Sequence, residues 1–197
     1  MPAKRPASRP APRLDPIPEG RRTPKQRALV KAISSGPRGG FNNSGPFAIW
    51  LHAPDFGMPA QALGGFARLR TGVPARLSEF AIIVTARLWR AHYEWHVHAP
   101  IAERAGVKPK TIADLRAGRI PKGAAKDERA VYDFIRELYK TKRVSERTYR
   151  RVHAILGTAA TVEFVGILGY YAMVAMSLNV FRMLPPPDSK LPFGEER

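Results

Sequence analysis

The chain of 197 residues is long enough for one domain with extensions, and its 44% hydrophobic content excludes a wholly disordered protein. It contains no cysteine, which excludes disulfides, thiolate zinc sites and cysteine nucleophiles. A formal net charge of +17 favours attraction to anions, whether nucleic acid, acidic lipid or carboxylate metabolites.

The basic charge is concentrated near the N-terminus. Residues 1–40 contain ten Lys or Arg residues, two acids and many prolines, and such a segment buries too little apolar area to offset the entropy cost of ordering. We therefore expect a flexible tail over 1–40, an all-α domain over 41–186 and a C-terminal tail over 187–197. No apolar segment of the secretory type follows the early basic residues, so we expect a cytoplasmic protein; composition leaves a transit peptide open.

Helices are expected through the first half of the domain. A loop rich in Gly, Asn and Ser precedes a short apolar element, Phe47–Pro54. Helical composition then follows over the segments Gln61–Arg70, Pro74–Arg90, Tyr93–Ala105 and Pro109–Gly118. Apolar residues cover most of the surface of Pro74–Arg90, which predicts a central buried helix.

The second half continues the helical pattern. Asp127–Lys140 is amphipathic, Ser145 caps a helix that ends at Gly157, and Thr161–Met183 forms the last helix. No alternating strand pattern occurs in the sequence, so the fold class is all-α. The run Phe164–Leu178 has fifteen residues without a charge, whereas a bilayer span needs about twenty. We expect a helix buried by neighbours or by another subunit rather than a membrane span.

Proton-transfer chemistry is indicated within Ser78–Pro100. Imidazole titrates near neutrality, and a carboxylate can orient it or change its pKa. Glu79 precedes a helix start on which Glu94 and His98 are four residues apart and share a face, while Tyr93 and His96 lie three apart on a neighbouring face. This mixture of acids and imidazoles predicts an active site.

Two simpler interpretations compete with that prediction. Glu94 and His98 can form a surface pair on an exposed helix, and His92 and His96 can face solvent. Metal binding by Glu94, His98 and either Glu79 or His96 is a weaker alternative, because the spacing matches no established zinc motif. We expect no metal and no cofactor.

The stretch from Phe47 to Pro186 resembles the carboxymuconolactone decarboxylase family, which shares its fold with the alkylhydroperoxidase D-like proteins. The resemblance is carried by PARLSEFAIIVTARLWRAHYEWHVHAPIAERAGV, DERAVYDFIRELY, VSERTYRRV and VGILGYYAMVAMSLNVFRM, in that order. The redox branch of the family places a Glu, a C-x-x-C pair and a His at fixed spacing. Here the Glu falls on Glu79 and the His on His98, but Ala91 and Glu94 occupy the cysteine positions.

The resemblance implies an all-α bundle of the alkylhydroperoxidase D-like type that assembles as trimers or hexamers. Without thiols the chain is not a thiol peroxidase. The resemblance therefore implies a cofactor-independent lyase, either a decarboxylase-like or an isomerase-like enzyme, that uses Glu/His acid–base chemistry on a small cyclic carboxylic acid or lactone.

We assign catalytic roles to Glu79, His98 and Glu94, with His98 as the acid/base and Glu79 as its partner. Substrate-binding residues are expected on the same helices and on the first and last helices of the domain: Tyr93, His96, Arg87, Arg90, His52, Trp50, Tyr170 and Asn179.

A nucleic-acid-binding protein is the rival interpretation. Ala102–Arg119 has the residue spacing of a helix-turn-helix, with Lys108, Lys110, Arg116 and Arg119 suited to phosphate contacts. The histidine cluster has no role in DNA readout, so we expect at most non-specific nucleic-acid binding through the basic tail, and no membrane association.

Overall fold

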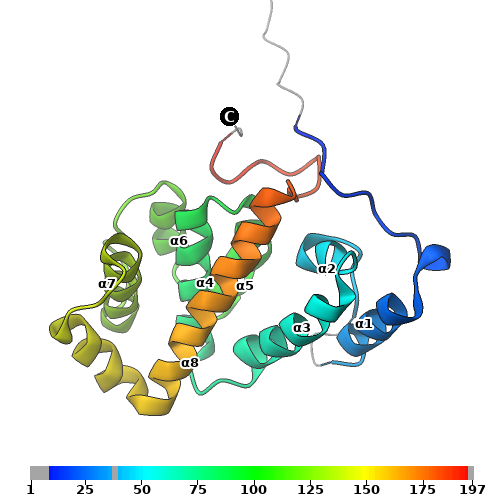
Figure 1. The fold of residues 1–197 in the computed structure, drawn as a ribbon. Helices are drawn as coiled ribbons and strands as arrows, with labels where there is room; N and C mark the ends of the chain where they lie inside the picture. The colour runs from blue at the N-terminus through cyan, green and yellow to red at the C-terminus, as the bar shows by residue number, and fades with distance from the viewer. Residues whose placement is uncertain (1–8, 37–39, 195–197) are drawn as a thin grey trace, which may run out of the picture.

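The computed structural model describes residues 9–36 and 40–194, and every regular element within these ranges is helical (Figure 1). A short 3-10 helix, η1 (Glu19–Arg21), comes first. The α-helices are α1 (Pro24–Ser34), α2 (Gly45–Trp50), α3 (Pro54–Leu69), α4 (Ala75–Trp89), α5 (His92–Arg104), α6 (Pro109–Arg116), α7 (Lys126–Thr141) and α8 (Glu146–Val180). The all-α prediction is confirmed.

Helix α4 is the centre of the fold. Every residue from Leu77 to Ala86 is buried, which confirms the prediction of a central helix without a solvent face. It packs against α5, α8, α7 and α6. In Figure 1, α8 crosses the molecule between α4–α7 on one side and α1–α3 on the other. Residues from both halves of the chain therefore meet around α8.

Helix α8 bends sharply at Gly157, which has φ 73° and ψ 177°. Because an L side chain rarely adopts this backbone conformation, glycine marks the break that the sequence predicted there. The Thr161 hydroxyl donates to the Gly157 carbonyl oxygen at 2.6 Å and stabilises the restart of the helix. The bend lets the first part of α8 follow α7, while the second part crosses the core.

By length and composition, α8 is the one helix in the described ranges that is apolar enough to cross a membrane. The core helix of a soluble protein passes the same test, and one third of the most apolar window of α8 is buried. Phe164, Ile167 and Leu168 pack in the core, whereas Val162 and Val180 are exposed. One face of α8 is therefore part of the core, and another remains uncovered in the single chain.

The sequence predicted that this helix starts at Gln61, but α3 begins seven residues earlier, at Pro54. Pro54 occupies the first turn, where no N–H is needed, so it starts the helix instead of ending the preceding element. Pro59 then lies within the second turn and removes one backbone hydrogen bond. Packing of α3 against α1 and α8 tolerates this loss.

The prediction of a solvated tail over 1–40 is wrong for helix α1. Thr23 and Gln26 form a reciprocal capping box, and Pro24 occupies the first turn. Leu29 and Ile33, four residues apart, are buried against the core. Residues 1–8 and 37–39 lie outside the described ranges, so the prediction for them is not addressed.

The C-terminal segment also packs on the domain. The ring centroid of Phe193 lies 5.1 Å from that of His92 and 5.2 Å from that of Trp95. Near the end of α8, the Arg13 amide donates to the Phe181 carbonyl oxygen at 3.1 Å, which brings the two terminal segments together. Within the described residues, the predicted tail therefore packs against the start of α5 through Phe193.

Candidate active site

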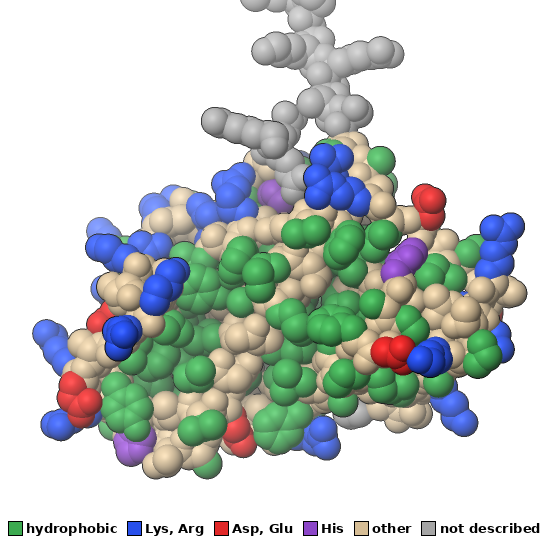
Figure 2. Space-filling view, in the orientation of Figure 1, with side chains coloured by type: hydrophobic (Ala, Val, Ile, Leu, Met, Phe, Trp, Pro, Cys, Tyr) green, Lys and Arg blue, Asp and Glu red, His purple; other side chains and the backbone are tan. Residues whose placement is uncertain are grey.

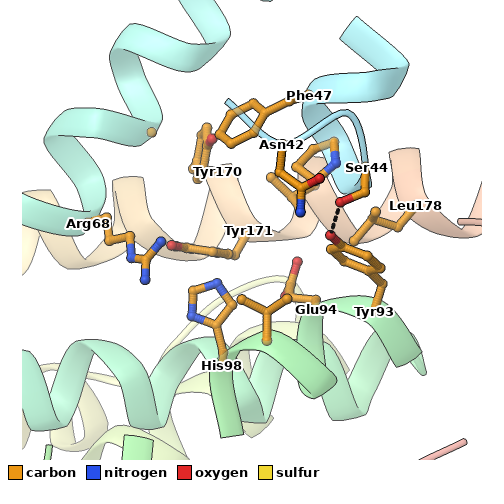
Figure 3. Close-up of a pocket in the computed structure, with 14 residues that line it drawn as sticks. Asn42, Ser44, Phe47, Arg68, Tyr93, Glu94, His98, Tyr170, Tyr171 and Leu178 are labelled. Carbon is orange, nitrogen blue, oxygen red and sulfur yellow. Dashed lines mark hydrogen bonds between the residues drawn. The ribbon is translucent and has the colours of Figure 1, made fainter. Parts of the chain in front are cut away.

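A cavity of about 140 Å³ lies between the N-terminal part of α2 and helices α3, α5 and α8 (Figure 3). Its apolar walls include Phe47, Val97, Val174 and Leu178. Its polar lining comes from the segment before α2 and from α3, α5 and α8, and comprises Asn42, Ser44, Arg68, Tyr93, Glu94, His98, Tyr170 and Tyr171. An apolar pocket with a few converging polar groups is the usual form of a small-molecule site.

His98 and Glu79 form a buried pair at this cavity. The Nδ1 atom of His98 lies 2.8 Å from the Oε2 atom of Glu79, and both side chains are 8% exposed. A carboxylate that accepts from Nδ1–H fixes the tautomer that leaves Nε2 as the acceptor. Nε2 is on the other side of the ring, so His98 can accept a proton from a molecule in the cavity while Glu79 stabilises the imidazolium.

Tyr171 lies against the edge of the His98 ring. The two ring centroids are 5.1 Å apart at an interplanar angle of 84°. Burial, and secondarily the nearby Glu79 carboxylate, raise the pKa of the Tyr171 phenol well above its usual range. The phenol therefore stays neutral and retains its proton as a hydrogen-bond donor.

Glu94 is 2% exposed, and neither carboxyl oxygen has a hydrogen-bond partner among the described residues. Burial raises its pKa well above the ordinary carboxyl value, so the surroundings favour the protonated, neutral form of Glu94. The surface-pair interpretation of Glu94 and His98 is therefore wrong, because both side chains are buried and His98 pairs with Glu79 instead.

Tyr93 is positioned by the segment that precedes α2. Its hydroxyl lies 2.7 Å from the Ser44 hydroxyl, and either atom can donate. Gly45 has φ 60°, and a Cβ there would lie 2.6 Å from the Tyr93 ring. Glycine thus permits both the turn and the close approach of Tyr93 to the cavity mouth.

Tyr170 approaches α3 in a similar way. A Cβ added to Gly64 would lie 1.9 Å from the Tyr170 hydroxyl oxygen, so only glycine allows this contact. The contact seats Tyr170 in the cavity wall between α3 and α8.

Arg68 is a cavity residue that the sequence analysis did not identify. It extends from α3 toward Tyr171 (Figure 3), and no carboxylate pairs with it among the described residues. Arg68 and Arg70 are only two residues apart, and the sequence contains no signal that selects Arg68. The nearby guanidinium gives the cavity a subsite for an anion.

Three predicted substrate-binding residues from the first and middle helices lie away from this cavity. Trp50 is buried in the core, 6.4 Å from Tyr170 between ring centroids. His52 is exposed and contacts the Asp15 carbonyl oxygen at 3.1 Å. His96 is exposed because it lies on the face of α5 opposite to the buried residues Glu94 and His98.

The remaining three lie near the other end of α4. Arg87 and Arg90 are eight and eleven residues beyond Glu79. At the rise of an α-helix, both lie at least about 12 Å from Glu79 along the axis of α4. Asn179 is exposed and donates to the Trp89 carbonyl oxygen at 2.7 Å. These assignments are corrected: of the eight predicted substrate-binding residues, the cavity brings together Tyr93 and Tyr170.

His92 is buried at the start of α5 but does not line the cavity. Burial, with smaller contributions from Arg90 and Arg9, lowers its pKa to about 4. It is therefore a neutral ring that packs against Phe193. The described residues contain no cluster of three or more His, Asp or Glu side chains arranged to hold a metal ion.

The segment Ala102–Arg119 forms a corner between α5 and α6, but its second helix has only eight residues. Thr111, Asp114 and Leu115 on that helix are buried, and Arg119 pairs with Asp114. These contacts are typical of a packed helical corner. A recognition helix would present its side chains to a DNA groove, whereas several side chains of α6 are buried in the fold or paired within it.

No family model and no curated protein matches the chain. One solved structure that matches is an uncharacterized peroxidase-related protein from Ralstonia eutropha, described as an alkylhydroperoxidase AhpD core. The TM-score is 0.74 at 17% sequence identity, over 94% of this chain and 96% of that chain. The chain therefore has the alkylhydroperoxidase AhpD core fold, and it has this fold without any cysteine.

Proposed function

We propose that the protein is a cofactor-independent lyase-like enzyme, decarboxylase-like or isomerase-like, that acts on a small cyclic carboxylic acid or lactone. The observation that supports this most is the buried His98–Glu79 hydrogen bond at a cavity that also contains the buried carboxyl group of Glu94, whose pKa is raised. A carboxylate-paired imidazole and a second carboxyl group whose protonated form is favoured can act as the base and the acid of a single site.

In a decarboxylation, the bond between the carboxylate carbon and the α-carbon breaks, and carbon dioxide leaves. The electron pair passes into an adjacent carbonyl group as an enolate, which the neutral Tyr171 and Glu94 can stabilise as donors. A proton from the imidazolium of His98 or from Glu94 then returns to the α-carbon. In an isomerisation, neutral His98 first removes a carbon-bound proton and later returns it to another carbon of the enolate.

Cavity size and charge support the proposed substrate class. The volume of about 140 Å³ compares with an engineered apolar cavity of about 150 Å³ that holds benzene. A single ring therefore fits in this volume. Arg68 provides the counter-charge for a substrate carboxylate at the rim of the ring-sized space.

Thiol-dependent peroxide reduction is not part of this proposal. It requires a sulfur nucleophile that forms a sulfenic acid and then a disulfide, and the chain has no cysteine. The Glu and His positions of the redox pattern remain, and the proposal assigns them proton transfer alone.

Self-association is a further part of the proposal. Val162, Val165, Met176 and Val180 are exposed on α8, and Figure 2 shows hydrophobic side chains gathered across the face that α8 crosses. Soluble monomers seldom expose a continuous apolar face of this kind. By resemblance, the protein forms a trimer or a multiple of three that covers this face.

The function is tested by incubating the purified full chain with a panel of small cyclic carboxylic acids and lactones. We expect release of carbon dioxide or a change of ring absorbance for a member of this panel, and its loss in His98→Gln. The matched control is His96→Gln, which removes an exposed imidazole two residues away and should leave turnover unchanged. Equal activity of His98→Gln and His96→Gln would contradict the proposal.

A further inference from the structure

A second cavity, also of about 140 Å³, lies between α4, the end of α6 and α7. It shares no lining residue with the cavity at His98. Three arginines, Arg87, Arg119 and Arg136, line it together with Tyr132, and none of its lining residues is acidic. The first cavity has mixed charge, whereas this one is lined by cations from three different segments.

The position of Arg87 in this cavity is determined by several contacts. Its Nε atom donates to the Arg116 carbonyl oxygen at 3.1 Å, and its guanidinium carbon lies 5.1 Å from the centroid of the Phe193 ring. Gly118 has φ 74°, and a Cβ there would lie 2.5 Å from an Nη atom of Arg87. The absence of a Cβ at Gly118 therefore lets the Arg87 guanidinium pack directly against the backbone there, and the hydrogen bond to Arg116 fixes its position at the cavity.

The positive charge of the cavity is only partly neutralised. Asp114 accepts from Nε and Nη2 of Arg119 at 3.1 and 2.9 Å, and it is also 3.6 Å from Lys110. Among the described residues, no carboxylate pairs with Arg87 or Arg136.

The environment of Arg87 has an energetic consequence. Burial, and secondarily the charge of Arg90, lower the pKa of its guanidinium, so the surroundings disfavour its positive charge. A bound anion would offset both effects, because an opposite charge nearby favours the charged guanidinium.

We propose that this cavity binds a phosphate group, either as inorganic phosphate or as the phosphate of a small monoester. Guanidinium groups donate bidentate hydrogen bonds whose geometry matches phosphate oxygens. An engineered cavity of about 150 Å³ holds the six heavy atoms of benzene, so a cavity of about 140 Å³ has room for the five heavy atoms of phosphate. Arg119 and Arg136 are exposed at its rim, which leaves an entry path and space for the remainder of a monoester outside.

The test is calorimetric titration of the full chain with inorganic phosphate and with glycerol phosphate, at constant ionic strength. We expect saturable binding of one phosphate group per chain, weakened about tenfold or more by Arg136→Gln. Arg136 is exposed and has no carboxylate partner among the described residues, so this variant should fold. The matched control is Arg147→Gln, which removes the same charge from an exposed position on α8.

Nitrogen-15 spectra of the arginine side chains locate the site. Phosphate should shift the Nε signals of Arg87 and Arg119 but not that of Arg147. Equal affinities of Arg136→Gln and Arg147→Gln would overturn the proposal, because general charge attraction would then account for binding. A duplex DNA that binds more tightly than either phosphate, with the same loss in Arg136→Gln, would also overturn it in favour of a nucleic-acid contact.

Discussion

The Nδ1 atom of His98 on α5 lies 2.8 Å from the Oε2 atom of Glu79 on α4, although the two residues are nineteen positions apart in the sequence. Both side chains are almost completely buried, so their hydrogen bond is protected from competing water. The contact orients the imidazole toward the cavity that Arg68, Glu94 and Tyr171 also line.

Glu79→Gln should lower turnover by about 100-fold or more. The amide can still contact Nδ1, but it cannot stabilise the imidazolium that forms when His98 accepts a proton. Steady-state kinetics and thermal unfolding, measured together, check this. A fall in the unfolding temperature with unchanged turnover would instead identify Glu79 as a structural partner of His98.

Glu94→Gln should reduce turnover while leaving the protein at least as stable at neutral pH. Glu94 has a raised pKa in the fold, so the unfolded chain loses this proton at lower pH than the folded chain does. The contribution of Glu94 to the free energy of unfolding is therefore fully present below pH 4.5, the ordinary pKa of a glutamic acid side chain. It is lost as pH rises toward the folded pKa, by up to about 1.4 kcal/mol per pH unit.

Urea unfolding of wild type and Glu94→Gln between pH 4 and pH 8 measures this difference. The free energy of unfolding of wild type should decline with pH relative to that of the variant. Parallel pH curves for the two proteins would show that Glu94 is already ionised in the fold.

His92 should produce the opposite dependence on pH. Its folded pKa of about 4 lies below the ordinary value of 6.5, so on acidification the unfolded chain binds a proton first. The associated stability is present above pH 6.5 and is lost as pH falls toward 4. In His92→Phe, the midpoint of urea unfolding should fall less between pH 7 and pH 4.5 than in wild type. An identical fall in both proteins would exclude His92 as a source of acid sensitivity.

Val162→Glu and Met176→Glu should each dissociate the proposed homo-oligomer, because a charge on the exposed face of α8 opposes burial against another copy. Sedimentation velocity at micromolar concentration, without detergent, measures the change. The control is Ile120→Glu, which alters an apolar residue of 52% exposure outside α8. A wild-type monomer under these conditions would contradict the assembly proposal, and a requirement for detergent would favour a membrane role for α8.

Nucleic-acid binding should be weak and indifferent to sequence, and it should decrease steeply with salt as counterions are released. Deleting residues 1–40 would also remove α1, whose Leu29 and Ile33 belong to the core, so the informative deletion covers residues 1–8. Fluorescence anisotropy with duplexes of different sequence checks both points. Sequence-specific binding that survives this deletion and is lost in Lys110→Gln would support the helix-turn-helix interpretation.

Local sequence patterns were sufficient to predict most of the helices. The apolar surface of α4, the cap at Ser145 and the break at Gly157 all depend on residues within one or two turns of each other. The family resemblance additionally predicted that Glu79 and His98 act as partners, and the structure places the two side chains in hydrogen-bond contact. Pro54 at the start of α3 and the capping box of α1 were present in the sequence as well. The sequence pattern predicted Pro54 as the end of the preceding element and the α1 segment as part of a tail, and both predictions were wrong because helix packing outweighs composition.

Only the tertiary structure decided which polar residues surround the cavity. Helical periodicity shows which side chains share a face of one helix, but it does not show which other helix lies opposite that face. Arg68 therefore lines the cavity at Tyr171, whereas Arg87 lines a separate cavity with Arg119 and Arg136. The sequence by itself determined most of the helices and singled out Glu79, Glu94 and His98 as candidates. The crossing of α8 between α3 and α5 determined which arginine lies near them, because that contact joins segments about 100 residues apart, beyond the reach of any local pattern.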